Sequence, residues 1–103
     1  MIIEIKNISY KVIMYEQEAL IVNKSGLHAR PAAEFVRAAS LFRSDISVIF
    51  KGLTLNGKSI INILSGGISK GSCVVIRAEG PDEIVAVETL IAIIENGISE
   101  ADI

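Results

Sequence analysis

The stretch Gly26-Leu27-His28-Ala29-Arg30-Pro31-Ala32-Ala33 lies where an apolar, strand-like run gives way to an amphipathic helix pattern. It contains the only histidine of the 103-residue chain, and Arg30 follows that histidine by two positions. Pro31 suits the first turn of a helix, because the N–H that proline lacks would have no intrahelical partner there. His28 should therefore lie directly before a helix N-terminus, where unpaired N–H groups and the helix dipole attract anions.

This arrangement predicts a phosphate-binding position beside an imidazole. The alternative is that His28 is an ordinary loop residue. A neutral imidazole, a guanidinium and a helix N-terminus that fall so close together favour the functional interpretation.

The composition indicates one domain with an aliphatic core. A chain of 103 residues can fold on a single core, and half of its residues are hydrophobic while only 5% are aromatic. The formal net charge of −2 provides no basic surface for nucleic acid. No apolar run approaches the roughly 18 residues of a membrane span.

The single cysteine, Cys73, cannot form an internal disulfide, and no signal-peptide pattern precedes the domain. We therefore expect a cytoplasmic protein without a membrane association. A single histidine without clustered cysteine or carboxylate ligands argues against a metal site, and no cofactor is expected.

Hydrophobic periodicity and turn residues predict the order β-α-β-β-α-β-α. Gly80-Pro81-Asp82-Glu83 should place a proline and acids in the first turn of the last helix, and Gly97 should stand just after its end. This order implies an α+β fold with helices on one face of an antiparallel sheet. The expected elements are strand 19–22, helix 31–42, strand 45–50, strand 53–55, short helix 59–64, strand 72–78 and a last helix before Gly97.

The first 14 residues alternate only loosely between apolar and polar types, and we assign them to an N-terminal extension ahead of a domain over 15–103. Three interpretations are open. The segment is an added strand, a partly ordered tail, or untranslated sequence upstream of a start at Met14.

Three motifs carry a resemblance to a known family: Gly26-Leu27-His28-Ala29-Arg30-Pro31-Ala32, Asn56-Gly57-Lys58-Ser59-Ile60 and Ala78-Glu79-Gly80-Pro81-Asp82-Glu83. With them, residues 16–98 resemble the histidine-containing phosphocarrier (HPr) family of the bacterial phosphoenolpyruvate-dependent sugar phosphotransferase system. The resemblance implies an open-faced β-sandwich, in which three helices cover one face of a four-stranded antiparallel sheet.

The resemblance also implies a phosphoryl relay and not an enzyme with a substrate pocket of its own. The histidine at the position of His28 accepts a phosphoryl group from Enzyme I on Nδ1, the pros nitrogen, and passes it to a sugar-specific Enzyme IIA. Arg30 would neutralise the phosphoryl oxygens, for which a planar guanidinium is well shaped. The backbone N–H groups of Ala29 and Arg30 would be the helix-terminal donors.

Ser59 is the second candidate site. Its hydroxyl suits an N-cap of the short helix, which is a purely structural role. In Gram-positive members of the family the matching serine is phosphorylated by HPr kinase/phosphorylase, so Ser59 is also a candidate regulatory site. Leu27, Ile61 and Leu64 are candidate partner-docking residues, with burial in the core as the alternative.

Two other classes of function remain as alternatives. The chain is also similar to nitrogen-related paralogues (NPr), which serve a regulatory relay. Another alternative is a Ser59-phosphorylated adaptor that binds a transcriptional regulator. Retention of His28 argues against a purely regulatory role. A hydrolase or metalloenzyme is disfavoured, because the sequence has no nucleophile-elbow or P-loop spacing.

Overall fold

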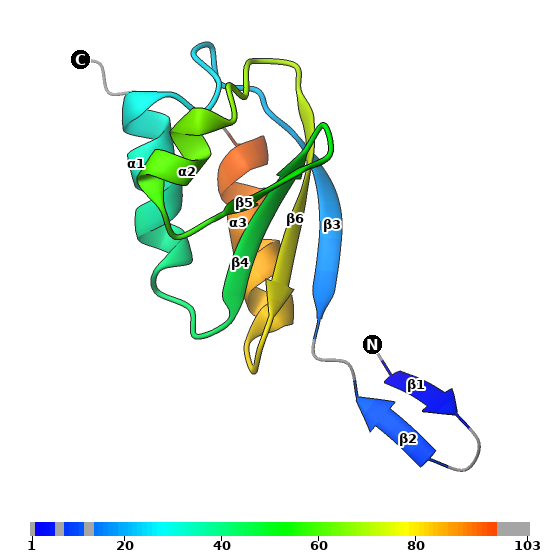
Figure 1. Ribbon diagram of the computed structural model, residues 1–103. Helices are drawn as coiled ribbons and strands as arrows, with labels where there is room; N and C mark the ends of the chain where they lie inside the picture. Colours follow the sequence, from blue (N-terminus) through cyan, green and yellow to red (C-terminus); the bar gives the residue numbers. More distant parts are fainter. Residues whose placement is uncertain (1, 6–7, 12–13, 97–103) are drawn as a thin grey trace.

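A computed structural model describes residues 2–5, 8–11 and 14–96. From Met14 onward, three helices cover one face of a four-stranded antiparallel sheet with the strand order β3-β6-β4-β5 (Figure 1). The element order predicted helices on one face of an antiparallel sheet, and the family resemblance implied an open-faced β-sandwich; both predictions are confirmed. The elements are β3 (Tyr15–Leu20), α1 (Ala29–Ala39), β4 (Asp45–Phe50), β5 (Leu53–Asn56), α2 (Ile60–Ser65), β6 (Cys73–Glu79) and α3 (Glu83–Glu95).

The two central strands have the alternation expected of a sheet with one covered face. In β4 the buried residues are Ile46, Val48 and Phe50, and in β6 they are Val74, Ile76 and Ala78. The core is almost wholly aliphatic, as the composition predicted, with Phe35 and Phe50 as its aromatic members.

A two-residue turn joins β4 to β5. Phe50 pairs with Leu53, and both turn residues have positive φ, 50° at Lys51 and 80° at Gly52. Two positive φ angles match the twist of a hairpin, and glycine tolerates such an angle without strain. The predicted hairpin at this position is confirmed.

The first strand of the sheet lies earlier than predicted. It spans Tyr15–Leu20, because its pairing with β6 runs from Tyr15 opposite Ala78 to Leu20 opposite Cys73. Leu20 and Val22, which the sequence pattern singled out, lie on the exposed side, whereas Ala19 and Ile21 are buried. The prediction of strand 19–22 was therefore wrong in its bounds.

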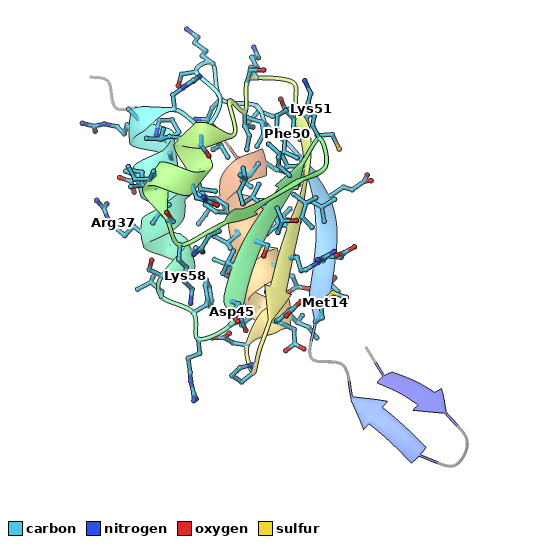
Figure 2. All side chains as sticks on the ribbon, in the orientation of Figure 1. Met14, Arg37, Asp45, Phe50, Lys51 and Lys58 are labelled. Carbon is cyan, nitrogen blue, oxygen red and sulfur yellow. The ribbon has the colours of Figure 1, made fainter. Side chains whose placement is uncertain are left out.

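Helix α1 begins earlier and ends earlier than the predicted 31–42. The Ser40 hydroxyl donates to the carbonyl of Val36 at 2.7 Å, and Phe42 then makes a shorter-range bond to Ala39. The Lys58 ammonium donates to the Phe42 carbonyl at 2.7 Å, so a side chain from another segment holds the chain where it leaves the helix (Figure 2). A tertiary contact of this kind has no signature in the local sequence pattern.

Helix α3 also differs in detail from its prediction. Asp82 is the N-cap and Pro81 precedes it, so the proline lies outside the first turn. In the predicted apolar stripe, Val87, Ile91 and Ile94 are buried but Ile84 is 54% exposed. Ala86 and Leu90 complete the core face instead. Gly97 lies outside the described residues.

The N-terminal segment forms a hairpin of its own. Its strands β1 (Ile2–Ile5) and β2 (Ile8–Lys11) pair antiparallel with each other and form a sheet separate from that of β3. In Figure 1 the hairpin projects from the start of β3, at the end of the molecule opposite the β3–α1 loop. A domain boundary near residue 14 remains a prediction.

Candidate functional site

His28 is the N-cap of α1, which confirms its predicted position before a helix N-terminus. Its backbone is extended (φ −94°, ψ −171°), and its carbonyl accepts the first intrahelical bond from the Ala32 N–H at 2.7 Å. The imidazole is exposed and makes no capping hydrogen bond. The ring nitrogens are therefore open to a reactant from solvent.

Two backbone donors point out of the helix next to this imidazole. The N–H groups of Ala29 and Arg30 have no hydrogen-bond acceptor within the described residues. Pro31 is the third helical residue and has no N–H to offer, so these are the donors left at this end. Unpaired donors at the positive end of an 11-residue helix favour an anion there.

Arg30 lies in the first turn of α1 and is exposed. Among the described residues its guanidinium forms no ion pair, whereas Arg37 on the same helix pairs with Glu34 at 3.1 Å. The structure thus leaves the charge of Arg30 available beside His28, where the sequence analysis placed it.

The loop that precedes His28 is held by a segment far away in the sequence. The Leu27 N–H donates to the Ile68 carbonyl at 2.9 Å, and both side chains are fully buried. Near the start of the same loop, the Ile21 N–H donates to the Ser72 carbonyl at 2.9 Å. Ile68 has no signature in the local sequence pattern, because its contact with Leu27 joins two distant loops.

Ser59 is the N-cap of α2, as its structural interpretation predicted. Its Oγ accepts a hydrogen bond from the Asn62 N–H at 3.2 Å, and its backbone is extended. Asn62 in turn accepts from the Asn56 N–H through its side-chain oxygen at 2.6 Å. The hydroxyl is half-buried, so its accessibility differs from that of the exposed imidazole of His28.

Helix α2 presents apolar side chains to solvent. Ile61 is 74% exposed and Leu64 is 37% exposed, whereas Ile63 on the other side of the helix is fully buried. The predicted docking role of Leu27 is wrong for its side chain, which is 1% exposed and packs in the core. A partner can contact Ile61 and Leu64 without any rearrangement.

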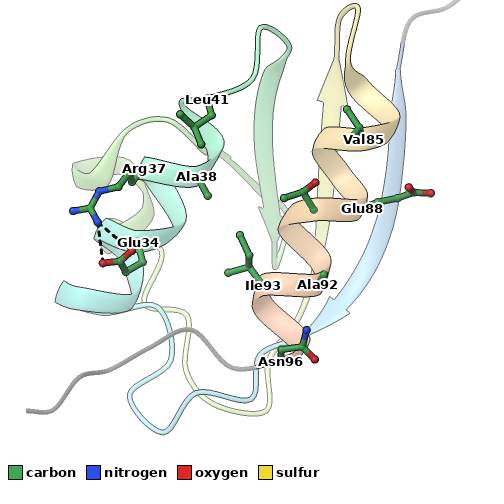
Figure 3. A pocket seen from close by; sticks show the side chains of 10 residues that line it. Glu34, Arg37, Ala38, Leu41, Val85, Glu88, Ala92, Ile93 and Asn96 are labelled. Atoms are coloured by element: carbon green, nitrogen blue, oxygen red, sulfur yellow. Dashed lines mark hydrogen bonds and ion pairs between the residues drawn. The ribbon is translucent and has the colours of Figure 1, made fainter.

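A groove of about 800 Å³ runs between α1 and α3 (Figure 3). Its walls include the Glu34–Arg37 pair and Leu41 from α1, and Val85 and Ile93 from α3. None of the predicted site residues lines it, so it is separate from the candidate site.

Metal-ligand clusters and membrane-spanning helices are both absent from residues 2–5, 8–11 and 14–96, which are the described part of the chain. No group of three or more His, Cys, Asp or Glu residues is arranged there to hold a metal ion. No helix in that part has the length and apolar character needed to cross a bilayer.

Comparison with known proteins identifies the family. Residues 15–96 match the family described as PTS HPr component phosphorylation site. Phosphocarrier protein HPr of Vibrio cholerae serotype O1 is 43% identical over 82 residues, which cover 80% of this chain and 96% of that protein. The chain belongs to the HPr family. HPr of Buchnera aphidicola subsp. Schizaphis graminum is 47% identical over 77 residues, 75% of this chain and 91% of that protein.

Solved HPr structures share the fold. HPr-C-His from Thermoanaerobacter tengcongensis superposes with a TM-score of 0.78 at 48% identity, covering 80% of this chain and 92% of that chain. A phosphocarrier protein HPr from Bacillus anthracis str. Ames gives a TM-score of 0.77 at 42% identity, covering 79% and 96%. The protein is thus a phosphocarrier-family member of the phosphotransferase system.

Proposed function

We propose that this protein accepts a phosphoryl group from Enzyme I on Nδ1 of His28 and passes it to a sugar-specific Enzyme IIA. The observation that carries the proposal is the exposed imidazole at the N-cap of α1, next to two backbone donors that have no acceptor among the described residues. Membership of the HPr family supports the same assignment. A relay of this kind operates in the cytoplasm, where both partners would be met.

The chemistry needs little from the protein beyond position and charge. A neutral imidazole with its proton on Nε2 has a lone pair on Nδ1, which can attack phosphorus without a separate base. The new N–P bond forms as the bond between phosphorus and Enzyme I breaks, and the group later leaves in the same way. Positioning and charge stabilisation dominate such transfers.

The residues around His28 supply that charge. The Ala29 and Arg30 N–H groups would donate to phosphoryl oxygens, and the Arg30 guanidinium would neutralise them. Since Arg30 has no ion-pair partner in the described chain, this role disrupts no existing contact.

Partner docking would use the exposed face of α2. Ile61 and Leu64 form an apolar surface on the helix that begins at Ser59. Exposed apolar side chains of this kind suit a transient interface, in which a small desolvated centre carries most of the binding energy.

Ser59 is the proposed regulatory site, phosphorylated by HPr kinase/phosphorylase. A phosphate there would stand at the start of the helix that carries Ile61 and Leu64. It would change docking through its charge and would leave the core intact. An NPr-like relay or an adaptor for a transcriptional regulator would use the same surface and is the alternative function.

The test is labelling with phosphoenolpyruvate and Enzyme I. The wild-type chain should take up one phosphoryl group in a form that acid hydrolyses and base preserves, as expected of phosphohistidine. His28→Ala should take up none while keeping its melting temperature, because an exposed imidazole contributes little to the core. Labelling of His28→Ala at the wild-type level would refute the proposal.

A further inference from the structure

Gly26 touches the backbone of a distant loop so closely that no side chain fits. Its φ is +63°, and a Cβ added there would stand 2.2 Å from the Ile68 carbonyl oxygen and 2.6 Å from the Ser69 Cα. Real Cβ contacts of this kind are essentially never under 3.0 Å, so either loop would have to shift. Both neighbours are backbone atoms, which cannot rotate away as a flexible side chain would.

The same carbonyl accepts the hydrogen bond from the next residue. Leu27 N–H donates to Ile68 O at 2.9 Å, and Leu27 and Ile68 are each 1% exposed. Ile68 lies in the loop that follows α2, two residues beyond its C-cap Gly66. One carbonyl therefore fixes the two residues that come immediately before His28.

Among the described residues, no hydrogen bond from outside α1 holds His28 itself. Its imidazole makes no capping bond, and the backbone contact is the Ala32 bond to its carbonyl, which belongs to α1 itself. The approach of the chain from Leu27 is consequently what orients His28 against the Ala29 and Arg30 donors.

We propose that the Ile68 carbonyl, in contact with the bare Cα of Gly26 and the N–H of Leu27, is the positioning group for the phosphoryl-accepting His28. This inference rests on the proposed function for its kinetic consequence. It also means that the loop after α2, the helix that begins at Ser59, is a direct support of the acceptor site. A displacement of that loop would move His28.

The test substitutes Gly26 and a matched glycine. Gly26→Ala adds both the steric contact and the cost of a positive φ. Gly26→Asn adds the same steric contact through its Cβ, but asparagine tolerates a positive φ far better than other non-glycine residues. Gly52, in the turn between β4 and β5, also has a positive φ, +80°, with nothing within 4 Å of an added Cβ, so Gly52→Ala and Gly52→Asn carry the φ cost alone and lie outside the Ile68 loop.

We expect both Gly26 variants to slow phosphoryl acceptance from Enzyme I by about tenfold to a hundredfold, since a displacement of about 1 Å at a reacting group has effects of this order. The turnover rate should fall, whereas the KM of Enzyme I for this protein should stay the same. The reason is that the proposed docking residues Ile61 and Leu64 are unchanged. The final stoichiometry of labelling should still reach that of wild type. A merely unfolded fraction would lower the stoichiometry instead. Both Gly52 variants should react at nearly the wild-type rate.

A second readout does not depend on phosphotransfer. In amide hydrogen exchange, the Leu27 N–H should be protected in wild type and in the Gly52 variants and exposed in Gly26→Ala and Gly26→Asn. The amide resonances of His28, Ala29 and Arg30 should shift in the Gly26 variants only. If Gly26→Ala does not fold, an ester in place of the Leu27 amide removes this one donor. It should slow phosphoryl acceptance and shift the amide resonances of His28, Ala29 and Arg30.

Equal rates and unshifted resonances in the Gly26 variants would overturn the inference while leaving the proposed function intact. Absence of labelling in wild type would refute the proposed function, and the exchange and resonance data would then decide the positioning role alone. Asparagine at Gly26 that restores the wild-type rate would show that φ, and not the Ile68 contact, matters.

Discussion

The Asp82 carboxylate binds Ser44 across the end of the sheet. Its Oδ1 accepts the Ser44 N–H at 2.9 Å and the Ser44 hydroxyl, and its Oδ2 accepts the Arg43 N–H at 2.9 Å. Ser44 is completely buried. The start of α3 is thereby tied to the loop between α1 and β4.

This contact predicts a pH dependence of stability. The Ser44 hydroxyl, and then the Arg43 N–H, lower the pKa of Asp82 from 3.8 to about 2. Because the pKa is lower in the folded state, the stabilisation is fully present above about pH 4 and is lost as the pH falls toward 2. Asp82→Asn should therefore lose less unfolding free energy than wild type between these values, as measured by urea denaturation.

Asp45→Asn is the control, since the Asp45 side chain is exposed and makes no hydrogen bond within the described residues. Identical acid profiles for wild type and Asp82→Asn would contradict the assignment of this stabilisation to Asp82.

Arg30→Ala should slow phosphoryl acceptance without abolishing it, because the Ala29 and Arg30 N–H groups remain. Loss of one positioned charge contact to a transition state costs about 2–4 kcal/mol, by analogy with an oxyanion-hole donor. Single-turnover labelling measures this loss. Arg37→Ala, on the same helix but paired with Glu34, should react like wild type. If Arg30→Ala also reacts like wild type, Arg30 takes no part in the transfer.

Ser59→Asp should slow the phosphorylation of His28 and leave the melting temperature near that of wild type. A negative charge is favourable at a helix N-terminus, so the effect falls on docking of an acidic partner surface. Ser59→Asn keeps the capping acceptor without the charge and should behave like wild type.

Salt sharpens this test of Ser59. Raising the ionic strength should narrow the gap in rate between Ser59→Asp and wild type, since screening weakens an electrostatic block. A gap that stays constant with salt would point to damage in packing, and the regulatory role of Ser59 would lose its physical basis.

A chain that starts at Met14 should match the full chain in melting temperature and in phosphotransfer. Strands β1 and β2 form a sheet apart from β3, and Met14 lies at the end of the molecule opposite the turn that contains Lys51 (Figure 2). The His28 loop lies at the same end as that turn (Figure 1). A marked loss of stability on removal of residues 1–13 would show that the hairpin is an integral part of the domain.

The local sequence patterns predicted those parts of the fold that a few adjacent residues determine. The alternation of Ile46, Val48 and Phe50, the Lys51-Gly52 turn and the Ser59 cap are all properties of a few adjacent residues. The predictions were wrong where a contact with a distant segment determines where an element begins or ends. Lys58 holds the chain beyond the end of α1, and Ser44 binds the Asp82 carboxylate at the start of α3.

The candidate site divides in the same way. Its acceptor position follows from the Gly26–Ala33 stretch, because glycine, histidine and proline there mark a helix start. The burial of Leu27 and its contact with Ile68 depend on the packing of two loops, and no sequence pattern in either loop predicts that packing.

The central claim is that His28 carries the phosphoryl group on Nδ1. The most direct measurement is nitrogen–phosphorus NMR of the chain labelled with ¹⁵N in its single histidine, after reaction with phosphoenolpyruvate and Enzyme I. We predict one phosphorus signal coupled to Nδ1 of His28, which disappears in acid and persists in base. A phosphorus signal uncoupled from the histidine, or one that survives acid, would contradict the account.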